Sequence, residues 1–179
     1  MPESDPVALH GPIRLLQLAH AGERAAAFAY AGHWRSVRRP ADRERIRTIK
    51  AEECGHRRRV HQMLLDLGGG PAPLREARMV VIGRVVSVLC FVSGPFVPMY
   101  GAGRIERRNV HAYVDAAALP RAAGHPELVH DLLHMAEVEW DHEAYFRAQV
   151  AGHPLLRLLA LWTPLGPRAA LRAVEAPAG

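Results

Sequence analysis

The chain has 179 residues, 49% of them hydrophobic and 23% charged, which is the composition of a soluble globular domain with a substantial core. Its two cysteines, Cys54 and Cys90, have neither a C-x-x-C nor a zinc-ligand spacing, which argues against a disulfide framework and indicates a reducing compartment. The net charge of +5 comes from scattered arginines, without a basic helix interleaved with aromatic residues, so we expect no nucleic-acid partner.

The first two predicted helices form an antiparallel hairpin. Residues 1–12 carry acids and prolines but no basic segment followed by an apolar run, so we interpret them as a flexible N-terminus and expect a cytoplasmic protein. The proline at position 12 favours a helix over residues 13–38, which Pro40 then ends. The next helix is predicted over residues 42–67, with Asp42 as its N-cap and a glycine-rich stop after it. The short link between them predicts the hairpin.

The second half of the chain is also predicted to be helical. Its most apolar stretch lies within residues 74–119, which we interpret as one long third element interrupted near Pro95. A fourth helix is predicted over residues 127–150, and residues 151–179 form an apolar tail with arginines and a short helix. The sequence therefore predicts an all-α protein, a four-helix bundle over residues 13–150 with a short C-terminal helical tail.

Two Glu-x-x-His spacings are the strongest indication of a metal site in the sequence. One pairs Glu53 with His56 and the other pairs Glu139 with His142, and each lies in an apolar stripe with steps of three and four residues. On a helix, positions three apart share one face, so each carboxylate and imidazole can bind one metal ion together. An ionised carboxylate in the core is costly without a partner, and a metal ion would neutralise it.

Two further glutamates lie in apolar helical faces without a histidine. Glu23 precedes the first pair and Glu106 precedes the second. In chain order the set reads Glu, Glu-x-x-His, Glu, Glu-x-x-His, which is the ligand inventory of di-iron and di-manganese carboxylate bundles. Carboxylates and imidazoles suit iron better than soft metals such as Cu(I). The predicted metal ligands are Glu23, Glu53, His56, Glu106, Glu139 and His142.

Short segments around these ligands resemble the demethoxyubiquinone hydroxylase family, the quinone-hydroxylating branch of the ferritin-like di-iron proteins. The resemblance covers about residues 13–150 and departs from the family at Arg107 and Ala112, where the family has a second acid and a second histidine. The matching segments are His20-Ala21-Gly22-Glu23 with Tyr30-Ala31-Gly32, the first Glu-x-x-His, Ile105-Glu106 with His111 and Tyr113, and the second Glu-x-x-His.

The resemblance implies a ferritin-like fold and an O2-dependent di-iron monooxygenase that hydroxylates a quinone or a related aromatic ring, as in ubiquinone biosynthesis. It implies two iron ions, O2 as co-substrate and an external reductant such as NADH, although the sequence has no Gly-x-Gly-x-x-Gly fingerprint of a nicotinamide domain. It also implies that Tyr113, which shares a helix face with Glu106, takes part in proton or electron transfer. Simple core packing is the other interpretation of this tyrosine.

Two questions stay open at this point. The same ligands would serve a ferritin-like metal-binding protein with a ferroxidase or iron-handling role, which would not need the apolar third element. The apolar segments 79–89 and 155–162 either lie at a membrane interface and admit a lipid-soluble quinone, or pack together, or form a homo-oligomer interface. In the first case the protein is peripheral on the inner face of the cell membrane.

Other acids and histidines lie outside the ligand stripes. We expect Glu52 and Glu137 to be solvated. His130 and His134 are spaced for zinc, but their face is shifted from that of the ligands, so we interpret them as surface histidines. His111 is interpreted as structural rather than catalytic.

Overall fold

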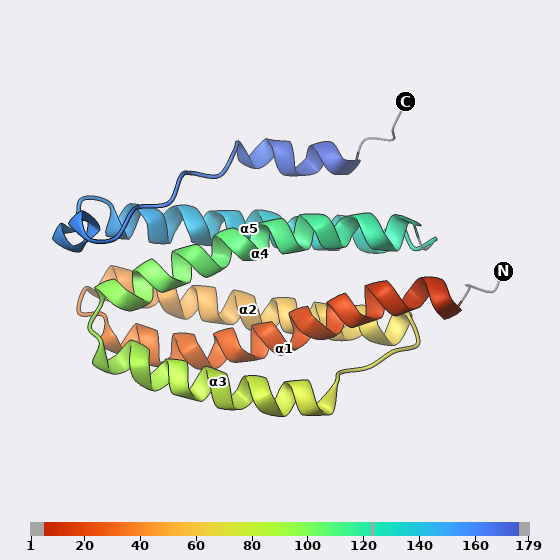
Figure 1. Cartoon of the computed structure of the whole chain (residues 1–179), viewed down its shortest axis with the longest axis horizontal. Helices are drawn as coiled ribbons and strands as arrows, with labels where there is room; N and C mark the ends of the chain where they lie inside the picture. Colours follow the sequence, from red (N-terminus) through yellow and green to blue (C-terminus); the bar gives the residue numbers. More distant parts are fainter. Residues whose placement is uncertain (1–5, 123, 176–179) are drawn as a thin grey trace. The chain divides into compact units, whose positions relative to one another are not determined.

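The computed structural model describes residues 6–122 and 124–175, and helix is the only regular secondary structure among them (Figure 1). The all-α prediction is confirmed. The long helices are α1 (Pro6–Ser36), α2 (Pro40–Asp66), α3 (Pro73–Val92), α4 (Phe96–Ala122) and α5 (Glu127–Val150). Two short 3-10 helices follow in the tail, η1 (Pro154–Arg157) and η2 (Arg168–Glu175).

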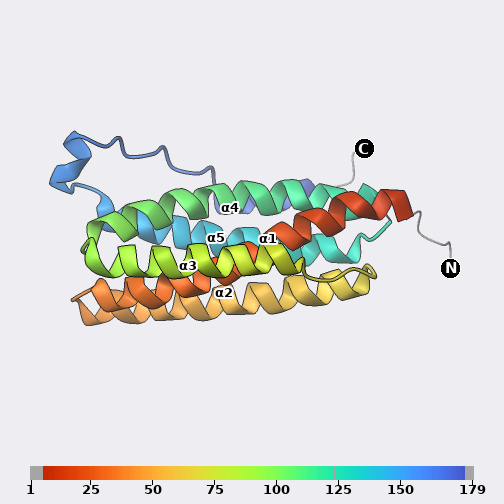
Figure 2. The same cartoon turned by 60° about the horizontal axis from the view of Figure 1, so that its bottom comes forward.

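The chain divides into two compact units, Met1–Pro98 and Met99–Gly179. The first unit holds α1, α2, α3 and the first residues of α4, and the second holds the rest of α4, α5 and the tail. Within the first unit, α1 contacts both α2 and α3, and both views show the three helices side by side (Figures 1 and 2). The predicted hairpin of the first two helices is confirmed.

Prolines begin helices in this chain more often than the sequence analysis allowed. Pro40 is the first residue of α2 rather than the end of α1, because a proline at that position lacks only an N–H that would have no helical partner. Arg39, not Asp42, is the N-cap, and the predicted capping role of Asp42 is wrong. Asp42 lies buried in the first turn, with its Oδ2 3.4 Å from Nε of Arg39. Similarly, α1 begins at Pro6 and contains Pro12 in its interior.

The predicted third element consists of two helices. The interruption lies where predicted, because Gly94 has a φ of +76°, which a residue with a side chain rarely adopts. The helix resumes at Phe96, and it ends at Ala122, three residues beyond the predicted end, with Pro120 inside it. The fourth predicted helix coincides with α5.

Close backbone contact holds α3 against α1. A Cβ atom at Gly83 would lie 2.8 Å from the Cα and the carbonyl oxygen of Ala25, and one at Gly32 would overlap the backbone carbonyl of Ser87. The only buried residues of α3 are Gly83 and Glu76. Small residues therefore fix the α1–α3 distance, whereas large apolar side chains of α3 do not contribute to a core.

The opposite side of α3 is an exposed apolar face. More than half of each side chain of this face is exposed, at Leu74, Val81, Val85, Val88, Leu89, Phe91 and Val92. An apolar surface of this kind is unusual on a helix that faces water on one side. Within residues 6–122 and 124–175, no helix has the length and the apolar character that crossing a membrane requires.

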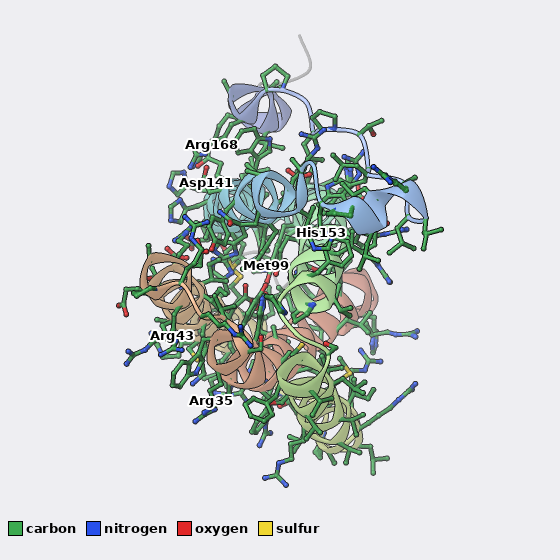
Figure 3. All side chains as sticks on the ribbon, turned by 90° about the vertical axis from the view of Figure 1, so that its left-hand side faces the viewer. Arg35, Arg43, Met99, Asp141, His153 and Arg168 are labelled. Atoms are coloured by element: carbon green, nitrogen blue, oxygen red, sulfur yellow. The ribbon has the colours of Figure 1, made fainter. Side chains whose placement is uncertain are left out.

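The tail is attached to α4 and α5 of the second unit. The Trp162 indole lies where a side chain at Gly103 would be, and its Nε1 donates to Glu143 Oε1 at 2.5 Å. Farther along, Nε of Arg168 donates to Oδ1 of Asp141 at 3.2 Å (Figure 3). The predicted tail helix is of the 3-10 type and contacts α5.

Glu137 of α5 is not solvated, contrary to the expectation from the sequence. Its side chain is buried, and Arg172 from the tail donates to both of its carboxylate oxygens, at 2.7 and 2.9 Å. These hydrogen bonds from Arg172 lower the pKa of Glu137 and outweigh the opposing effect of burial. The prediction of a solvated Glu137 is wrong because the tail covers this part of α5.

Candidate metal centre

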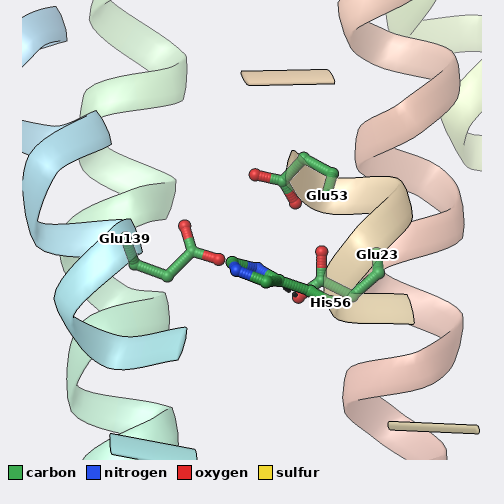
Figure 4. A group of neighbouring side chains, drawn as sticks. All are labelled: Glu23, Glu53, His56 and Glu139. Carbon is green, nitrogen blue, oxygen red and sulfur yellow. Dashed lines mark ion pairs between the residues drawn. The ribbon is translucent and has the colours of Figure 1, made fainter. Parts of the chain in front are cut away.

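The first unit gathers three of the predicted ligands into what we name the first half-site: Glu23 of α1 with Glu53 and His56 of α2. One ligand atom from each lies within 4.8 Å of the other two, and all three side chains are buried. Nδ1 of His56 lies 4.0 Å from Oε1 of Glu23 (Figure 4). Glu139, drawn in the same figure, belongs to α5 of the second unit.

Helical periodicity explains the position of the α2 ligands. Glu53 and His56 lie between Ile49 and Val60 on one stripe of α2, and the side chains of Ile49, Glu53 and Val60 are completely buried. The apolar residues on either side bury the stripe and carry the carboxylate and the imidazole into the core with them. Burial therefore follows from the hydrophobic pattern, and the cost of the buried charge has to be offset by a partner.

The second unit gathers the other three predicted ligands into the second half-site: Glu106 of α4 with Glu139 and His142 of α5. One ligand atom from each again lies within 4.8 Å of the others, and all three side chains are buried. Nδ1 of His142 lies 3.3 Å from Oε2 of Glu139. Asn109, one turn after Glu106, donates from its amide to Oε2 of Glu106 at 2.8 Å and orients that carboxylate.

The donor sets of the two half-sites are identical. Each consists of two carboxylates and one imidazole from two helices, which suits a hard or borderline divalent ion such as Fe2+ or Mn2+. Three protein ligands would leave coordination positions of a bound ion open for water or a further ligand. The buried residues present therefore fit a metal ion.

The remaining residues singled out by sequence have different positions. Tyr113 is buried on α4, two helical turns after Glu106. His130 and His134 are exposed on α5, as expected for surface histidines, and Nδ1 of His130 lies 3.1 Å from Nη1 of Arg172. His111 is exposed on α4. None of these three histidines lies in either half-site.

Sequence reasoning missed a buried polar cluster around Glu76, the only acid of α3. Its Oε1 lies 2.8 Å from Nδ1 of His20, and its Oε2 accepts hydrogen bonds from Arg24 at 3.0 Å and Arg57 at 3.2 Å. Burial alone would raise the pKa of Glu76, but the bonds to Arg24, His20 and Arg57 lower it overall. The cluster joins α1, α2 and α3. The sequence feature that could have indicated it is a single acid within an otherwise apolar, arginine-containing helix.

A further buried histidine, His33 of α1, makes stability depend on pH. Burial lowers its pKa from 6.5 to about 4, so the folded protein keeps it neutral while the unfolded chain takes up a proton below pH 6.5. Stability is therefore lost as the pH falls from 6.5 towards 4. We expect His33 alone to reduce the free energy of unfolding by about 2 kcal/mol between pH 7 and pH 5.

Urea unfolding of the wild type and of His33→Gln at both pH values measures this contribution. The variant should lose less stability than the wild type between pH 7 and pH 5. His10→Gln is the matched control, because His10 is an exposed histidine on the same helix. Equal pH dependence of His33→Gln and the wild type would show that His33 does not contribute.

Comparisons with known proteins identify no relative of this chain. No protein-family model, no curated protein and no solved structure matches the chain. The function has to be inferred from the chemistry of the residues themselves.

Proposed function

We propose that the two half-sites are the ligands of one di-iron centre in a ferritin-like bundle over residues 13–150. The observation that carries this proposal is the repetition of the same buried donor set, two carboxylates and one imidazole from two helices, in each unit. Four carboxylates and two imidazoles would leave two ferrous ions with little net charge. A chain with only one such set would support no more than a mononuclear site.

We further propose that the protein is an O2-dependent monooxygenase that hydroxylates a quinone or a related aromatic ring. Two bound irons would supply the activation of O2. The glutamates offset the charge of the metal, and Asn109 holds the carboxylate of Glu106 in one orientation. The phenol of Tyr113, two helical turns after Glu106 on the same helix, is assigned to proton and electron transfer. Electrons come from an external reductant such as NADH.

The apolar face of α3 supports a lipid-soluble substrate. Arg78 and Arg84 are exposed on the same helix as this face, and an amphipathic helix with arginines can lie in the head-group region of a membrane. Two arginines of the tail do not support the same role, because Arg168 and Arg172 form ion pairs with Asp141 and Glu137. We assign peripheral membrane contact to α3 alone, and a homo-oligomer through this face is the competing outcome.

Aerobic single turnover of the ferrous protein with short- and long-tailed quinones and simple phenols tests the function. When the reaction is run under 18O2, we expect at least one of these compounds to give a product that carries one added 18O atom, detected by mass spectrometry. Accumulation of a ferric core without any oxygenated product would instead assign the protein to iron handling, the second function that the same ligands can serve.

Substitution of Val81, Val85 and Leu89 by serine tests the role of α3 in the same assay. The variant should keep its iron and its turnover of short-tailed quinones, but lose liposome binding and turnover of long-tailed ones. Val81→Ala alone, which keeps the face apolar, is the control. A change of oligomeric state in the triple variant with unchanged liposome binding would show that the face joins two copies of the chain.

A further inference from the structure

A basic pocket on the first unit belongs to neither half-site. It is an open hollow between α1 and α2 with a volume of about 470 Å³. Four cationic side chains, an indole and a thiol line it, and no carboxylate is among its described lining residues. The residues that define this Trp34 pocket are Trp34, Arg35, Arg47, Lys50, Cys54 and Arg58.

The positive charge of the Trp34 pocket is largely uncompensated. In the described part of the chain, no carboxylate forms an ion pair with Arg35, Lys50 or Arg58. Arg47 has one such partner, Glu44, at 3.6 Å, and both side chains are more than half exposed, so this pair is weak. Like charges that converge without counter-charges repel one another, and a bound anion would relieve that repulsion.

The indole of Trp34 holds two guanidinium groups in place. The Cζ atoms of Arg35 and Arg47 lie 4.6 and 5.3 Å from the centre of a Trp34 ring, within the range of cation–π contacts. Arg35 also donates to the backbone carbonyl of Ala31. Side chains ordered in this way lose less conformational entropy when a ligand binds, and arginine forks match the geometry of phosphate oxygens.

We propose that the Trp34 pocket binds a nucleoside diphosphate. Two linked phosphate groups would form ion pairs with all four cationic side chains, whereas a single phosphate would leave part of the positive charge uncompensated. The volume is within the range of small-molecule sites, and the planes of the indole and the guanidinium groups offer stacking surfaces for a base. The proposal does not depend on the metal centre, so either can fail without the other.

Cys54 provides a reporter inside the Trp34 pocket. It lies between Glu53 and His56 in the chain, but its side chain is partly exposed and lines the pocket. Cys90, the other free and partly exposed cysteine, lies on α3 and does not line the pocket. A ligand in the pocket therefore shields one thiol and leaves the other as an internal reference.

Calorimetric titration of the full chain with ADP, AMP and pyrophosphate tests the proposal. ADP should bind more tightly than AMP, and pyrophosphate should compete with it. Arg47→Ala combined with Lys50→Ala should weaken ADP binding by about tenfold or more, because charge-assisted hydrogen bonds are lost. Arg78→Ala removes an exposed positive charge from α3 in the same unit and should leave the affinity unchanged.

Alkylation with iodoacetamide, followed by peptide mass spectrometry, locates the ligand. ADP should slow the modification of Cys54 and not that of Cys90, and this readout needs no variant to fold. Absence of ADP binding at millimolar concentration, or equal affinities of the double variant and Arg78→Ala, would overturn the proposal. So would shielding of Cys54 by anionic vesicles that ADP does not reverse, because the pocket would then face a lipid surface.

Discussion

Replacing Glu53 by alanine is expected to remove iron from the purified protein, whereas replacing its neighbour Glu52 leaves the iron content unchanged. Glu53 is completely buried among the first half-site ligands. Glu52 is partly exposed on α2, and its Oε2 lies 3.3 Å from Nη1 of Arg45. The two variants remove the same charge from adjacent positions. A difference between them therefore reports ligation rather than the overall charge of the protein.

Counting the irons distinguishes one shared centre from two separate sites. If the half-sites form one di-iron centre, the wild type should bind about two irons per chain, and Glu53→Ala or Glu139→Ala should each lose both. Independent mononuclear sites would lose one iron and keep the other. Elemental analysis after reconstitution with ferrous iron gives the stoichiometry, and full retention of iron in both variants would refute the metal centre itself.

Gly32→Ala is expected to destabilise the protein strongly, although it adds only one methyl group. The new Cβ would overlap the backbone carbonyl of Ser87 on α3, and a backbone atom of a helix cannot move aside as a flexible side chain can. The two helices would have to separate. Overpacking of this kind costs about 1–3 kcal/mol and more where relaxation is blocked, so we expect a loss of about 3 kcal/mol.

Gly22→Ala is the matched control for Gly32→Ala. Gly22 lies on the same helix, and a Cβ there would have no neighbour within 4 Å among the atoms of the described residues. Alanine should be neutral at this position or stabilise α1 by up to about 1 kcal/mol, because glycine is a poor helix former. Urea unfolding of both variants gives the comparison, and equal stabilities would mean that α1 and α3 are not in close contact.

The sequence predicted what depends on local periodicity. The residues of each Glu-x-x-His pair share one face of a helix because they are three positions apart, and the apolar stripe around them determined that this face is buried. The fourth helix was placed correctly because Pro126 precedes it and Gly152 follows its last turn. These signals act over a few residues, which is why they can be interpreted without a structure.

The sequence did not predict interactions between distant segments. Glu137 was expected to be solvated because its partner Arg172 is 35 residues away in the tail. The cluster around Glu76 escaped notice for the same reason, since Arg24 is 52 residues away. Pro40 was misinterpreted because a proline between two helices can end one or begin the other, and only the backbone decides between them.

Each half-site is complete within one contiguous part of the chain, and this has a consequence for the order of assembly. All ligands of the first half-site precede Glu106, the earliest ligand of the second. Domains fold from the N-terminal side while the chain is being synthesised. Under the proposed function, the first half-site can fold before the second has been translated, but the metal ions bind only when both half-sites are present, so that metal loading follows the synthesis of α5.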